Sequence, residues 1–96
     1  MSVSTLYLVV YDISNDKRRT KLHDRLLDYG TPVQYSVFEC LLDPKTKVKM
    51  QAMVNKTIKP RKDSLRIYCI CSDCAEKAEI VGGREILKPD NEPIVV

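Results

Sequence analysis

The sequence lacks any apolar run near the roughly 20 residues that cross a bilayer, and its first residues lack the basic start of a signal peptide. It also has no internal repeats and no low-complexity segment. We therefore expect a cytoplasmic protein that does not enter a membrane. At 96 residues the chain is the size of one domain, too short to enclose a large ligand cavity, so a functional site should lie on a surface or at an interface.

Histidine is nearly absent, since His23 is the only one, and we expect it to be an ordinary surface residue. Four cysteines occur without a secretory signal, which favours free thiols in a reducing compartment over disulfides. They are Cys40, Cys69, Cys71 and Cys74. A metal or redox site built from the last three is the alternative, but no histidine follows them at ligand spacing.

Charge is ordinary in amount but uneven along the chain. Hydrophobic residues make up 44% and charged residues 30%, and the net charge is +3, as in a soluble globular domain. Residues 1–62 hold twelve Lys or Arg against six Asp or Glu, whereas residues 63–96 hold four against seven. A basic half suits a polyanion such as nucleic acid, although it equally suits simple solubility.

Periodicity and turn residues predict an α+β domain. Residues 5–12 alternate with apolar side chains on both faces, which predicts a central strand covered by helices on one side and by another apolar surface, such as that of a partner subunit, on the other. The expected order along the chain is a strand at 5–12, a helix at 17–29, strands at 33–40 and 64–71 around a helix at 45–58, and a short strand at 79–81.

This order departs from a βαββαβ unit, in which the second helix lies between the last two strands. Either the helix at 45–58 is the crossover or the tail supplies a missing strand pairing, and the pattern leaves both open. We divide the chain into a domain at residues 1–83 and a tail at 84–96. The tail is apolar enough to need a surface, and a strand added to the sheet edge of a partner would provide one.

Asp12 ends the first strand and is followed by the polar residues Ser14, Asn15 and Asp16, a place where carboxylates commonly meet ligands or metals. It is the best single candidate for chemistry. The alternative is that Asp12 only hydrogen-bonds the turn or caps the helix. Mg²⁺ is typically held by one or two carboxylates with waters and phosphates, so a two-fold axis that supplied Asp12 twice would complete a site.

Five cations gather at the start of the first helix, where they oppose the helix dipole. A cationic surface beside Asp12 would grip phosphate, although a solvated face explains such a run equally well. These cations are Lys17, Arg18, Arg19, Lys21 and Arg25. A second basic stretch, between Lys45 and Lys62, is expected to be solvated helix surface or to follow a nucleic-acid backbone.

The string Tyr11-Asp12-Ile13, the Asp16-Lys17-Arg18-Arg19 turn and the strand Gln34-Tyr35-Ser36-Val37-Phe38-Glu39 together resemble the CRISPR-associated protein 2 family over nearly the whole chain. The resemblance implies a ferredoxin-like βαββαβ fold. It also implies a homodimer with facing sheets, in which each C-terminal strand completes the partner's sheet.

The resemblance also implies functional residues. The aspartate matching Asp12 would hold Mg²⁺ at the dimer axis of an endonuclease, with arginines matching Arg18 or Arg19 beside it. Phe38 matches an aromatic position of the family close to this site at the dimer axis, which makes it a candidate nucleic-acid contact. Lys21 stands where some relatives carry an arginine, and lysine cannot make the same bidentate phosphate contact.

Three hypotheses remain. The first is an Mg²⁺-dependent endonuclease acting on RNA or DNA during spacer acquisition, with Asp12, Arg18 and Arg19 as its catalytic residues. The second is a non-catalytic adaptor that holds DNA by its backbone and bridges subunits of the CRISPR integrase. The third is a small metal-binding module that uses the cysteines near residue 70.

Overall fold

The computed structural model describes residues 3–82, 86–87 and 93–94. The main elements in chain order are β1 (Thr5–Asp12), α1 (Asp16–Leu26), β2 (Thr31–Gln34), β3 (Val37–Leu42), α2 (Pro44–Thr57), β4 (Ser64–Ile70) and α3 (Ser72–Lys77). The α+β class that the sequence predicted is confirmed.

The main sheet has four strands in the order β2-β3-β1-β4, and every neighbouring pair is antiparallel. β1 is central and pairs with β3 from Thr5 opposite Leu42 and with β4 from Leu6 opposite Ile70. α2 connects β3 to β4. This is the ferredoxin-like βαββαβ order, so the expectation drawn from the family resemblance is confirmed.

The predicted strand at 33–40 is wrong in one respect, because the segment is a hairpin of two strands. β2 ends at Gln34, Tyr35 and Ser36 form the turn, and β3 begins at Val37. A two-residue turn shifts the alternation by one residue, because Gln34 and Val37 are cross-strand partners on the same face although they are three residues apart. The prediction instead continued one alternation through the turn, and so short a run does not reveal the shift. The turn contains no glycine, which removes the other usual signal. The hairpin supplies the strand that the sequence pattern lacked.

The short strand predicted at 79–81 is also wrong. Those residues form no regular element, and helix α3, which the sequence did not predict, begins at Ser72. Asp73 lies in its first turn and Lys77 in its last, which suits the helix dipole. The chain therefore leaves β4 through a helix.

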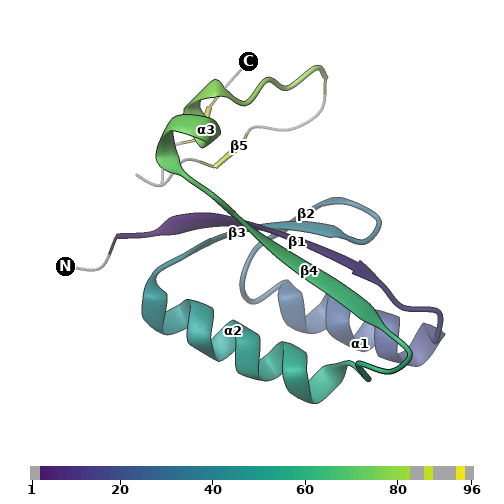
Figure 1. Ribbon diagram of the computed structural model, residues 1–96. Coiled ribbons are helices and arrows are strands. Elements are labelled where there is room, and N and C mark those ends of the chain that lie inside the picture. The colour runs from purple at the N-terminus through teal and green to yellow at the C-terminus, as the bar shows by residue number, and fades with distance from the viewer. Residues whose placement is uncertain (1–2, 83–85, 88–92, 95–96) are drawn as a thin grey trace.

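Helices cover the two faces of the sheet to different extents (Figure 1). On one face α1 and α2 cover alternate side chains of the strands, including Val9, Phe38 and Cys40, which are fully buried. On the other face α3 covers only one end, where Ala75 packs on Leu6. The rest of that second face, called the open face below, carries the remaining alternate residues of β1, β3 and β4.

The helices α1 and α2 begin within one residue of the predicted starts at 17 and 45. Asn15 caps α1 by accepting a hydrogen bond from the Arg18 amide at 2.9 Å, and Asp43 caps α2 by accepting one from the Thr46 amide at 2.7 Å. α1 ends at Leu26, before the predicted stop at Gly30. A Cβ at Gly30 would collide with the Glu39 carbonyl oxygen and Cys40 Sγ, so this glycine lets the chain pass close to β3.

Most of the tail at 84–96 lies outside the described residues. Within it, β5 (Ile86–Leu87) pairs antiparallel with β6 (Pro93–Ile94). The predicted pairing of this tail with a partner's sheet stays a prediction. Among the described residues, no helix has the length and apolarity needed to cross a membrane.

Candidate nucleic-acid interface at the end of β1

Asp12 is the last residue of β1, opposite Ser64 of β4, and its side chain is exposed. Alternation along β1 sends Tyr11 into the helix-covered core and places Asp12 on the open face. The next residue, Ile13, is only 3% exposed, and it anchors the following loop in the core. The carboxylate therefore projects from a fixed strand end rather than from a loose turn.

Arg19 braces the loop that follows Asp12. Its guanidinium donates to the Ile13 carbonyl at 2.9 Å, approaches the Ser14 carbonyl at 3.5 Å, and pairs with the Asp16 carboxylate. The Arg19 side chain remains 41% exposed, so it can also meet a ligand. The structure thus places the Arg19 guanidinium on the loop that follows Asp12, and its role as a phosphate clamp stays a prediction.

Arg18 points the other way. Its guanidinium makes two parallel hydrogen bonds to Asp63, from Nε at 2.9 Å and from Nη2 at 3.0 Å, and its side chain is only 18% exposed. The Lys59 amide also donates to Asp63 at 2.8 Å. These contacts lower the pKa of Asp63, chiefly through the Arg18 hydrogen bond, and that bond raises the pKa of Arg18.

This geometry argues against the predicted phosphate clamp at Arg18, because the bidentate face of the guanidinium is already occupied by a fully buried carboxylate. Asp63 was missed by sequence reasoning. The only signal was a single acidic residue after the run from Lys59 to Lys62, which reads equally well as a solvated turn.

Phe38 is buried with no exposed surface, so its ring serves the core of this chain, and its contact with nucleic acid stays a prediction. Its ring lies edge-on to His23, with centroids 5.2 Å apart, and tilted against Tyr11 at 6.4 Å. The alternation of β3 explains the burial, because Phe38 shares the helix-covered face with Cys40 and Leu42. Phe38 therefore positions the side chains around it.

The remaining cations of α1 separate into two groups. Lys17 and Lys21 are exposed and line a shallow groove of about 450 Å³ along the helix. Arg25 instead donates to Thr57 Oγ1 of α2 at 2.7 Å, which joins the two helices. The first group therefore presents its charge to solvent, whereas Arg25 is held between the helices.

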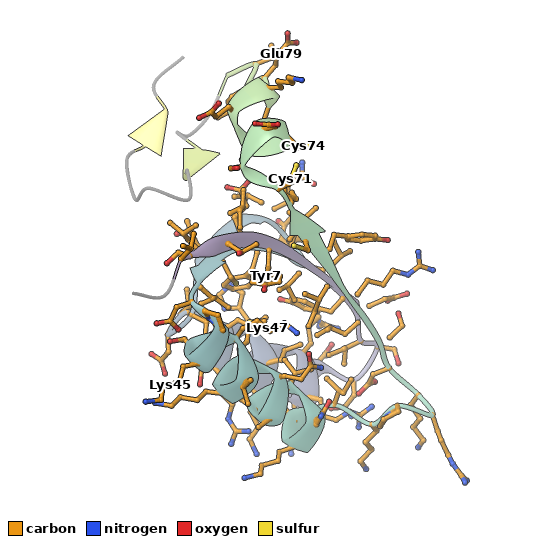
Figure 2. All side chains as sticks on the ribbon, turned by 60° about the vertical axis from the view of Figure 1, so that its left-hand side comes forward. Tyr7, Lys45, Lys47, Cys71, Cys74 and Glu79 are labelled. Carbon is orange, nitrogen blue, oxygen red and sulfur yellow. The ribbon has the colours of Figure 1, made fainter. Side chains whose placement is uncertain are left out.

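The second basic stretch is not uniformly solvated. Lys47 of α2 lies over the ring of Tyr7, 5.6 Å from its centroid, and donates to Gln51 at 2.9 Å (Figure 2). A cation placed on an aromatic face contributes to packing between helix and sheet. Lys45 in the same helix extends away from the protein.

A cleft of about 380 Å³ lies between α1 and the β2-β3 turn. Its lining residues are Tyr11, Arg19, Thr20, His23, Tyr35 and Ser36. Tyr35 is 99% exposed at the tip of the turn, an unusual position for an aromatic side chain. Burial raises the pKa of Tyr11, and the nearby Arg19 charge offsets part of that rise. Sequence reasoning missed this cleft because the hairpin that forms one wall was read as one strand.

No group of three or more His, Cys, Asp or Glu side chains in the described part of the chain is placed to hold a metal ion. The end of β1 offers one carboxylate, Asp12. Mg²⁺ needs only one or two protein carboxylates and takes its other ligands from water and phosphate, so an exposed carboxylate such as Asp12 is of the type that this ion binds.

The open face carries a short apolar strip bordered by charged and polar residues. Leu8 of β1 lies opposite Glu39 of β3, and Val10 lies between Val37 of β3 and Arg66 of β4. The side chains of Leu8, Val10 and Val37 are half-buried. Tyr68 of β4 lies opposite Leu8 and is 46% exposed. Such a sheet surface, left uncovered by α3, is typical of an interface.

Comparison with known proteins agrees with this architecture. The family model for CRISPR associated protein Cas2 matches residues 5–78, from the start of β1 to the end of α3. A protein of Synechocystis named CRISPR-associated endoribonuclease Cas2 3 is 39% identical over 90 residues, which cover 94% of this chain and 98% of that protein.

Solved structures show the same fold. The crystal structure of Streptococcus pyogenes Cas2 at pH 6.5 superposes with a TM-score of 0.70 at 30% identity, covering 80% of this chain and 99% of that one. A chain of a partial Cas6-RT-Cas1–Cas2 complex matches with a TM-score of 0.71 at 27% identity, covering 96% and 92%. With these matches over the strands, the Asp12 loop and the hairpin, the chain belongs to the CRISPR-associated Cas2 family.

Proposed function

We propose that two copies of this chain join through their open faces and bring two Asp12 carboxylates to a common axis. The apolar surface of Leu8, Val10 and Val37 supports this arrangement, because a two-fold interface pairs the same surface patch on both subunits. Asp12 lies on that same face, at the strand end, so pairing the sheets directs both carboxylates toward the interface.

We further propose that this dimer is a Mg²⁺-dependent endonuclease acting on the phosphodiester backbone of RNA or DNA during spacer acquisition in the cytoplasm. The observation that carries the proposal is the exposed Asp12 carboxylate at the end of β1, next to the loop that the Arg19 guanidinium holds. Bound Mg²⁺ would polarise the phosphodiester and activate water. The side chains of Arg19, Lys17 and Lys21 would neutralise the phosphates on either side of the cut.

The relatives support this activity, since the Synechocystis protein is named an endoribonuclease. The free state of all four cysteines suits a reducing cytoplasm. Arg18 has no direct role in this proposal, because it supports the fold through Asp63.

The test is cleavage of labelled RNA and duplex DNA with Mg²⁺, comparing the natural protein with Asp12→Asn. Asp28→Asn, an exposed carboxylate just beyond α1, is the matched control. We expect Asp12→Asn to bind nucleic acid and not cut, and Asp28→Asn to do both. Equal cleavage by the natural protein and Asp12→Asn would contradict the nuclease proposal.

A second function is favoured by the relative found in a complex named for Cas1 and Cas2. In this alternative, the chain is a non-catalytic adaptor that holds duplex DNA by its backbone and bridges CRISPR integrase subunits. The tail at 84–96 would then complete the sheet of a partner.

The adaptor predicts salt-sensitive duplex binding and co-elution with the integrase subunit, both retained by Asp12→Asn. Absence of cleavage in the natural protein, together with such binding, would select the adaptor over the nuclease. Cleavage that needs Asp12 would select the nuclease, whether or not the integrase also binds.

A further inference from the structure

Two of the four cysteines lie side by side at the end of the molecule away from Asp12. Cys71 immediately follows β4, and Cys74 is the third residue of α3 (Figure 2). Both thiols are exposed and free. Nothing in the proposed endonuclease or adaptor uses them.

The spacing of this pair suits a covalent bond between the sulfurs. The Ala75 amide donates to the Cys71 carbonyl at 2.9 Å, which closes a helical turn over the intervening residues. Residues three apart on a helical turn have Cβ atoms about 5–6 Å apart, close to the roughly 3.5–4.5 Å that a disulfide needs. A small backbone adjustment in this exposed turn would close the difference between the Cβ atoms, and rotation of the two side chains would then bring the sulfurs together.

The two thiols also differ in acidity. The amide and the thiol of Cys74 stabilise the Cys71 thiolate and lower the pKa of Cys71, whereas that thiolate raises the pKa of Cys74. The Asp73 amide adds to the lowering at Cys71, and the Asp73 carboxylate opposes it. One sulfur of the pair is thus favoured as the nucleophile and the other as the proton-bearing partner.

Cys40 provides the contrast within the same chain. It has no exposed surface, and burial together with the Glu39 charge raises its pKa to about 12. A thiol in that state does not react at neutral pH. Cys69 is exposed on β4, two residues before Cys71, and serves as a reference for an ordinary accessible thiol.

We propose that Cys71 and Cys74 form a reversible dithiol-disulfide site whose reaction partner is a low-molecular-mass disulfide of the glutathione type. The Cys71 thiolate attacks one sulfur of the small disulfide, which forms a mixed disulfide and releases one small thiolate. Cys74 then loses its proton to solvent and attacks the Cys71 sulfur, and the second small thiolate leaves. Two protein thiols are oxidised, and one small disulfide is reduced to two thiols.

The site is compatible with the surrounding packing. α3 is held to the sheet by Ala75 on Leu6, with Ile70 and Ala78 packed against them, and neither sulfur takes part in that cluster. Oxidation would therefore constrain the first turn of α3 without removing a core contact. The site lies at the rim of the open face, since α3 covers one end of that face.

The experiment treats the reduced full-length protein with glutathione disulfide, quenches it with acid, alkylates the remaining thiols and measures intact mass. We expect a product that is lighter by two hydrogens and has lost two alkylation sites, which peptide mapping assigns to Cys71 and Cys74. Cys74→Ser should stop at one glutathione adduct on Cys71. Cys71→Ser should react roughly 10-fold or more slowly.

Cys69→Ser is the matched control and should form the internal disulfide at the natural rate. Circular dichroism of each variant verifies that the exposed substitutions leave the fold intact. Equal reaction of Cys69, Cys71 and Cys74, or adducts on Cys71 and Cys74 without an internal disulfide, would overturn the proposal. So would an internal disulfide that requires Cys69.

Discussion

The junction between β1 and α1 has an inner and an outer side, and residues adjacent in sequence belong to opposite sides. Arg18 turns inward to the fully buried Asp63 carboxylate, whereas Arg19 stays 41% exposed over the loop after Asp12. One step along a helix rotates the side chain by about 100°, which is enough to separate a structural cation from a surface one. A basic cluster in a sequence is therefore not one functional unit.

The largest effect is expected at Phe38 on the inner side. Phe38→Ala should lower the free energy of unfolding by about 3–5 kcal/mol, because it leaves a cavity beneath His23 and Tyr11. Urea denaturation measures this loss of stability. Phe38→Leu should lower the free energy of unfolding much less than Phe38→Ala does. A Phe38→Leu protein of natural stability that fails to bind nucleic acid would show that the ring acts in recognition after all.

The next effect concerns the Arg18–Asp63 pair. Asp63→Asn should lower the melting temperature at pH 7 by more than about 5 °C, because the substitution leaves Arg18 without its counter-charge. Arg18 and the Lys59 amide hold the pKa of Asp63 below its usual value, so the stabilisation is present above about pH 4. It is lost as the pH falls through the folded-state pKa, where the carboxylate becomes protonated.

Melting curves between pH 7 and pH 2 test whether the stabilisation by Asp63 is lost as the pH falls. The difference between the natural protein and Asp63→Asn should shrink toward acid, while Asp28→Asn should track the natural protein throughout. A difference that grows on acidification would refute the assignment of Asp63 as a stabilising carboxylate.

Substituting each of the two arginines by lysine compares the inner and outer sides of the junction directly. Arg18→Lys should lower the melting temperature, because lysine cannot reproduce two parallel hydrogen bonds to Asp63. Arg19→Lys should leave the melting temperature nearly unchanged and weaken nucleic-acid binding several-fold. The reverse pattern, with Arg18→Lys stable and deficient in binding, would restore the phosphate role predicted for Arg18.

The smallest effect is expected for the free lysines of the outer side. Lys17→Gln and Lys21→Gln should each reduce the slope of log affinity against log salt by about 1, with no change in melting temperature. Fluorescence anisotropy at several salt concentrations measures the slope. Arg25→Gln is the control, since Arg25 is bound to Thr57, and an equal loss of slope there would indicate nonspecific charge effects.

Much of the fold was predictable because the residues that specify these elements lie within each element or directly beside it. The alternation of β1, the Asn15 and Asp43 caps and the Pro44 helix start each act within a few residues, and the structure contains all of them. The β2-β3 hairpin and α3 were missed. A two-residue turn without glycine shifts the alternation by one residue, which a short run does not reveal, and a six-residue helix shows too little periodicity to be recognised.

The sequence by itself determined the α+β class, the central strand and the position of Asp12 at its end, because alternation and capping are properties of neighbouring residues. Only the tertiary structure decided which candidate side chains are free. Arg18 meets Asp63 forty-five residues away, Arg25 meets Thr57, and Phe38 enters the core. Such partners depend on how α1, α2 and the sheet pack together, and no pattern of nearby residues records that packing.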